Sequence, residues 1–193
     1  MKASDSALFS QLTLRALEYA GRGEVPPPEE AAVFLMELPG LPTHCPEHHF
    51  IVPAALLISF CLSRGDSRDR LAEKLEMARG RAAAVPGGVC GNCGCCGAAV
   101  GAGIAASLLL DTAPKQERNW DFVNHVTAAC LTKIAGIGGP RCCKRVTFLA
   151  LAAARPLLEQ KLGLQLPAGT KPLCRYFPVN PECKHGLCPF YPR

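Results

Sequence analysis

The sequence predicts an all-α fold, a compact helical domain with cysteine-rich loops at helix N-termini and an irregular, cysteine- and proline-rich C-terminal tail. Apolar residues recur at helical spacing in several segments, and proline- or glycine-rich breaks separate those segments. Hydrophobic residues make up 49% of the 193 residues and aromatic residues only 6%, so small side chains dominate the apolar share. Small side chains let helices pack closely, and the length suits a single core.

Two helices are expected in the first forty residues. Ser4 or Asp5 can cap a first helix that ends near Ala20. Three consecutive prolines then interrupt the chain. Two glutamates follow them in the first turn of a second helix, where the helix dipole favours negative charge. Pro39-Gly40 ends this helix, so residues 1–40 are expected to form an N-terminal helical segment.

Residues 41–166 are expected to form a helical, metal-binding core. Apolar periodicity, caps and breaks predict five helices in it, and Pro156 predicts a kink in the last one. Asp66 is expected to cap the second of them. The charged residues from Arg64 to Arg81 are typical of the solvated face of that helix. The predicted ranges are 50–62, 66–81, 97–110, 120–135 and 140–163.

The sequence is organised around four cysteines within seven residues, Cys90, Cys93, Cys95 and Cys96. Glycines separate them, and the apolar run 97–110 that follows is typical of a buried helix. The unpaired amides and the dipole at a helix N-terminus favour a thiolate or an anionic thiolate-bound cluster. Glycines let backbone amides approach sulfur closely. This loop therefore predicts a metal site, with iron–sulfur as the favoured metal.

A second set of ligand-type residues precedes the expected helix at 50–62. Cys45 and the histidines His44, His48 and His49 lie within six residues. Cys45 is interpreted as a metal ligand, and one histidine as a ligand or a group that moves protons. A polar loop with a capping histidine is the alternative interpretation.

Another glycine-rich stretch precedes the last core helix. Pro140 suits the first helical position, which places Cys142 and Cys143 in the first turn, beside three cations that include Arg141. The helix N-terminus and the cations both lower the pKa of a thiol and favour thiolate. Consecutive residues on a helix point about 100° apart, so the two thiols need not bind the same metal. Arg141 is expected to line the site as an anion contact.

The tail over 167–193 is rich in proline and carries Cys174, Cys183 and Cys188. Such a chain has no core of its own and stays disordered unless docking or a metal fixes it. The Cys-Pro ending is typical of the last ligand of small iron–sulfur sites. We therefore expect at least two of these thiols to be ligands in a tail docked on the core. Free thiols on a tail laid over the helices are the alternative.

The twelve cysteines divide into two core residues and ten candidate ligands. Cys61 and Cys130 lie on apolar helix faces, where a lone cysteine is usually a small core residue. Ten thiols could hold two four-iron clusters, one cluster beside a reactive pair, or two zinc sites. The expected metal ligands are Cys90, Cys93, Cys95, Cys96, Cys142, Cys143, Cys174, Cys183 and Cys188. Cys45 is added as a residue expected to bind the cofactor. The expected catalytic residues are His44, His48, His49 and Arg141.

Charge and composition argue against several classes of partner. The net charge is +5 without a long basic run, so no nucleic-acid partner is expected. The longest apolar runs are shorter than the roughly 20 residues of a membrane span, so no membrane partner is expected. The chain opens without a secretory signal, and its vicinal cysteines suit metal binding or redox chemistry better than a disulfide framework. These features predict a cytoplasmic protein.

The motifs HCPEHHFIVPAALL, VPGGVCG, GAAVGAGI, GPRCCKR and NPEC…CPFY together resemble an uncharacterised cysteine-rich domain family of anaerobic archaea and bacteria, a domain of unknown function. The resemblance covers 43–191. It implies an anaerobic setting, which suits an oxygen-sensitive cluster, and a methyltransferase or radical-chemistry enzyme as partner. We therefore expect a 4Fe–4S protein of anaerobic metabolism that transfers electrons or sulfur. A zinc-stabilised protein-interaction module and a metal-free thiol redox or sulfur-transfer protein are the alternatives.

Overall fold

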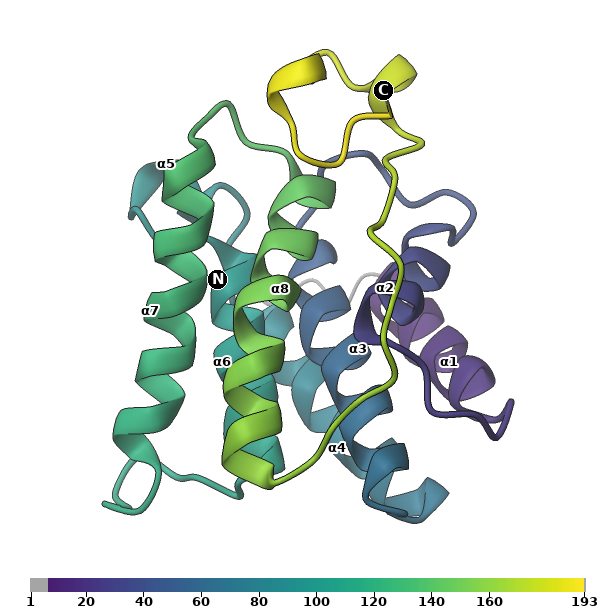
Figure 1. Cartoon of the computed structure of the whole chain (residues 1–193), viewed down its shortest axis with the longest axis vertical. Coiled ribbons are helices and arrows are strands. Elements are labelled where there is room, and N and C mark those ends of the chain that lie inside the picture. Colours follow the sequence, from purple (N-terminus) through teal and green to yellow (C-terminus); the bar gives the residue numbers. More distant parts are fainter. Residues whose placement is uncertain (1–6, 193) are drawn as a thin grey trace.

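The computed structural model describes residues 7–192, and all regular secondary structure within that range is helical (Figure 1). The all-α prediction is therefore confirmed. The predicted capping residues Ser4 and Asp5 lie outside the described residues. The helices are α1 (Ala7–Ala20), α2 (Pro28–Met36), α3 (His48–Ser63), α4 (Arg68–Ala83), α5 (Val89–Asn92), α6 (Gly97–Leu109), α7 (Trp120–Ile137) and α8 (Cys143–Leu162), followed by the short 3-10 helices η1 (Phe177–Val179) and η2 (His185–Leu187).

Helix α3 lies at the centre of the core. Every residue from Phe50 to Cys61 is buried. The helix packs against α1, α2, α4, α6 and α8, and a helix that is enclosed in this way must be apolar on all its faces. Helix α6 is its main neighbour and also contacts α7 and α8. Cys61 on α3 and Cys130 on α7 both lie in this core, which confirms that they are packing residues.

Glycines allow α6 to approach the N-terminal half of α3. Pro53 lies inside α3 and has no N–H to donate to the carbonyl of His49. A Cβ at Gly101 would lie 2.7 Å from that carbonyl oxygen and 2.8 Å from Cδ of Pro53. One turn earlier, a Cβ at Gly97 would lie 2.2 Å from the ring of His49. The two helices therefore fit together only because these positions lack side chains.

Two helix starts differ from the sequence prediction. Ser67, rather than Asp66, caps α4, since its hydroxyl accepts a hydrogen bond from the amide of Arg70 at 3.2 Å. Asp66 instead pairs with Arg64 at 2.5 Å. Helix α8 begins at Cys143 rather than at Pro140, and Cys142 occupies the N-cap with extended backbone angles. The two vicinal cysteines therefore stand on either side of the start of the helix.

The C-terminal tail runs back along the helices from the end of α8 to its beginning (Figure 1). Arg155 on α8 holds its first part by donating to the carbonyls of Leu166 and Pro167, at 2.9 and 2.8 Å. Further along, Arg175 pairs with Glu37 at 3.1 Å, beyond the end of α2. The tail therefore brings its three cysteines to the N-terminal end of α8.

No helix in the described range combines the length and the apolar character that crossing a bilayer would need.

Gly101→Ala is expected to destabilise the protein. Overpacking costs about 1–3 kcal/mol, which exceeds the roughly 1 kcal/mol that alanine gains over glycine as a helix former. Gly80→Ala on α4 is the matched control, because a Cβ there meets nothing within 4 Å, and it should be neutral or stabilising. Thermal unfolding checks the pair. A Gly101→Ala protein as stable as the Gly80→Ala protein would contradict this packing.

Candidate functional site

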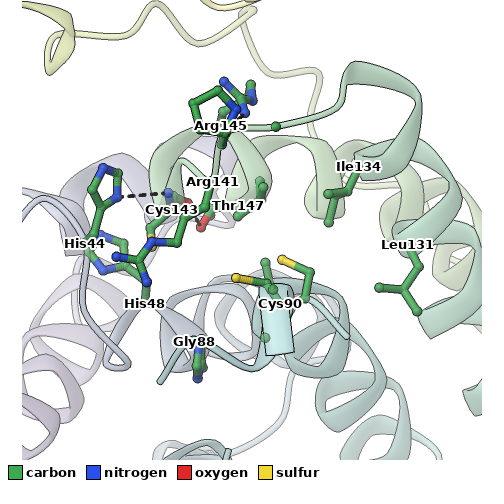
Figure 2. Close-up of a pocket in the computed structure, with 18 of the residues that line it drawn as sticks. His44, His48, Gly88, Cys90, Leu131, Ile134, Arg141, Cys143, Arg145 and Thr147 are labelled. Atoms are coloured by element: carbon green, nitrogen blue, oxygen red, sulfur yellow. Dashed lines mark hydrogen bonds between the residues drawn. The ribbon is translucent and has the colours of Figure 1, made fainter. Parts of the chain in front are cut away.

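A pocket of about 720 Å³ lies between the N-terminal ends of α3, α6 and α8 and the C-terminal half of α7 (Figure 2). Leu131 and Ile134 of α7 form an apolar wall on one side, and Arg141 lies on the opposite side. Four cysteines from three separate parts of the chain line the pocket: Cys45, Cys90, Cys96 and Cys143.

Three of these four cysteines lie at the start of a helix. Cys45 precedes α3 by three residues, Cys96 is the N-cap of α6, and Cys143 is the first residue of α8. The amides of Ala98 and Ala99 lower the pKa of Cys96, as expected for free N–H groups at a helix start. The positive ends of three helices therefore point toward one pocket.

Burial outweighs these favourable amides. It is the main reason why the pKa of Cys45 is raised to about 12 and that of Cys143 to about 11, and it also raises the pKa of Cys96. The carboxylate of Glu47 adds to the effect at Cys45. The sequence-based expectation of low-pKa thiolates at Cys143 is therefore wrong for the protein without a metal, because desolvation exceeds the effect of Arg141 and Lys144.

A buried chain of three polar groups leads inward from the pocket. The sulfur of Cys45 lies 3.1 Å from Nδ1 of His48, and Nε2 of His48 lies 2.6 Å from Nζ of Lys144. Burial, assisted by Lys144, holds the pKa of His48 well below its usual range, so the ring is neutral at pH 7. When the ammonium of Lys144 donates to Nε2, the proton of the neutral ring is on Nδ1 and faces the sulfur.

Lys144 contacts this site through His48, although sequence analysis treated it only as a flanking cation. It is almost fully buried, and its ammonium lies 4.4 Å from the centre of the Tyr176 ring. Burial lowers its pKa, and Cys45, Cys143 and Cys142 act in the opposite direction. Its position in the sequence could have identified it. A lysine in the first turn of a helix is unfavourable because of the helix dipole, which indicates that another interaction stabilises it there.

The other predicted catalytic residues have different surroundings. His44 accepts a hydrogen bond at Nδ1 from the amide of Cys143 at 3.4 Å, and its Nε2 lies 3.0 Å from Oδ1 of Asn180 in the tail. His44 therefore joins the loop before α3 to α8 (Figure 2), and it also joins that loop to the tail. His49 lies 3.3 Å from the carbonyl of Val85, and burial lowers its pKa. Arg141 is exposed at the pocket wall.

The remaining predicted ligands lie outside the pocket lining. Cys93 is exposed and Cys95 is half-buried. The structure brings the other four together beside a second, much smaller cavity: Cys142, Cys174, Cys183 and Cys188. As the side chains stand, no group of three or more His, Cys, Asp or Glu residues between 7 and 192 is arranged to hold a single metal ion.

A family model described as a family of unknown function, DUF5714, matches residues 24–191. No curated protein and no solved structure matches the chain.

The two core thiols are expected to resist alkylation in the folded protein. Burial raises the pKa values of Cys61 and Cys130 to about 12, and a raised pKa keeps a thiol protonated at every lower pH, so about 1 in 10⁴ would be thiolate at pH 8. Iodoacetamide should therefore label exposed Cys93 and leave both core thiols unmodified until denaturant is added. Peptide mass spectrometry measures this. Labelling of Cys130 at the rate of Cys93 would contradict its place in the core.

Proposed function

We propose that this chain is an iron–sulfur protein with a cluster in the pocket between α3, α6 and α8. The chain belongs to DUF5714, a family of unknown function. One observation carries this proposal. Four thiols from three separate parts of the chain line one open pocket toward which the positive ends of three helices point. Cys45, Cys90, Cys96 and Cys143 are the proposed ligands, and a four-iron cluster takes about four.

The electrostatics of the pocket suit an anionic cluster. Helix N-termini stabilise negative charge, and Arg141 and Arg145 also line the pocket. Arg145 is buried and donates to the carbonyls of Gly138 and Pro140, at 3.1 and 2.5 Å, so it also holds the loop before α8 in place. Coordination deprotonates a thiol, so metal binding would overcome the raised pKa values of the buried cysteines.

The openness of the pocket favours a functional cluster over a structural zinc ion. A structural zinc site is closed and draws four ligands to about 2.3 Å from one point. The pocket is much larger than such a site needs, and a cluster distributes its ligands over several iron atoms. The alternatives are a zinc-stabilised interaction module and a metal-free thiol protein. Measurement of metal content distinguishes both from an iron–sulfur protein.

A cluster bound here would supply electron transfer or sulfur transfer, and an oxygen-sensitive cluster would suit anaerobic metabolism. The residues of the chain would provide the rest of the site. Arg141 would hold an anionic group of a substrate, since it is exposed at the pocket wall. Neutral His48 would hold its Nδ1 proton against the sulfur of Cys45. Leu131 and Ile134 would exclude water from the opposite wall.

Anaerobically purified protein is expected to be brown and to contain iron with matching acid-labile sulfide. Cys96→Ser and Cys45→Ser should each remove at least about half of the iron bound at the pocket, because each deletes a ligand. Cys61→Ala is the control, since it changes a thiol of α3 that lies in the core away from the pocket. Iron and sulfide analysis with a visible spectrum measures the effect.

A colourless protein that contains zinc and no iron would overturn the cluster and favour the interaction module. A protein that folds without any metal would leave the vicinal thiols as the reactive groups. Equal iron content in Cys96→Ser and Cys61→Ala would rule out the pocket as the iron-binding site.

A further inference from the structure

The second cavity has four cysteines on its walls and lies apart from the pocket. Cys142 comes from the N-cap of α8, and Cys174, Cys183 and Cys188 come from the tail. The cavity measures about 10 Å³, close to the space of one water molecule. All three other thiols line the same cavity as Cys174 and act on its pKa as neighbouring charges.

Hydrogen-bond donors already point at three of these sulfurs. The sulfur of Cys142 accepts from the amide of Arg145 at 3.5 Å and from the side-chain amide of Asn180 at 3.4 Å. The amide of His185 donates to Cys183 at 3.3 Å. Burial raises the pKa of Cys174, and the amide of Tyr176 acts against this by donating to its sulfur. N–H groups directed at sulfur stabilise thiolates, and they commonly surround thiolate ligands of metals.

The charges around the cavity suit a negatively charged centre. Lys144, Arg145 and Lys184 line it, and no carboxylate among residues 7–192 does. Four thiolates around a divalent ion carry a net charge of about −2, which three cations can balance. The neighbouring carboxylate of Glu182 lies 3.2 Å from His44 instead.

The tail has little regular secondary structure of its own. Beyond residue 163 its described structure contains only the three-residue helices η1 and η2. Two aromatic contacts hold its end, Phe148 with Phe190 and Phe177 with Tyr191. The amide of Cys174 donates to the carbonyl of Phe190 at 2.7 Å, which brings the first and last cysteines of the tail together. A segment of this kind is commonly fixed by a metal.

We propose that Cys142, Cys174, Cys183 and Cys188 form a second, closed metal centre that fastens the tail to the start of α8. The centre binds one thiophilic divalent ion, such as Zn²⁺, through four thiolates after the thiols turn inward. Four protein ligands around a cavity of this size leave no position for a substrate, so the site is structural. It is separate from the pocket, which has Cys143 on its wall.

Cys183→Ser tests this centre through two measurements, metal content and trypsin cleavage after Arg175. Arg175 is exposed and lies between the first two cysteines of the tail. The variant is expected to lose the metal of one site, and cleavage should become about tenfold faster or more, because the loop is released. Leu187→Ser is the control, since Leu187 is 78% exposed and adjoins Cys188, and it should change neither measurement. Loss of one zinc identifies the metal, whereas loss of about four irons with sulfide would overturn a single-ion centre.

Cys96→Ser separates this centre from the pocket. It should leave both the tail metal and the protease resistance unchanged, even if the pocket holds no cluster. The proposal is overturned if Cys183→Ser matches wild type in metal content and cleavage rate. If that variant does not fold, wild-type protein is stripped with a chelator and supplied with Zn²⁺ alone. Failure of Zn²⁺ to slow cleavage after Arg175 would overturn the proposal as well.

Discussion

The close approach of α3 and α6 determines where the ligand-type residues meet. Gly97 and Gly101 let the first turns of α6 lie against His49 and Pro53, where any side chain would collide. This contact places the N-terminal ends of the two helices side by side, and α8 packs against both. Thiols that begin these helices therefore meet at one end of the domain. A larger residue at either glycine would separate the walls of the pocket as well as loosen the core.

The start of α8 divides the cysteines into two sets. Cys142, at the N-cap, lies beside the thiols of the tail, whereas Cys143, one residue later, lies on the wall of the pocket. His44 contacts both sides, since it accepts from the amide of Cys143 and lies beside Asn180 of the tail. These contacts of His44 connect the start of α8 with the tail. The vicinal cysteines thus lie between two groups of thiols and belong to different ones.

The sequence was sufficient for much of the fold, because long apolar segments and strong breaks act locally. It predicted α6 and α7 to within two residues of their ends and assigned Cys61 and Cys130 to the core. It could not show that Cys142 lies beside cysteines more than 30 residues away, because the spacing of residues in a sequence does not reveal that the tail folds back onto α8. It also favoured thiolate at Cys143, because local charge is visible in a sequence and burial is not.

The ammonium of Lys144 lies between the two groups of thiols. Cys45 and Cys143 on one side, and Cys142 and Cys174 on the other, all act to keep it charged, and its buried position leaves little water to screen them. A single cation is thus shared by two thiol clusters. Negative charge at either group of thiols helps to keep Lys144 protonated, and protonated Lys144 favours negative charge at the other group. This coupling acts through one ammonium and requires no movement of the backbone.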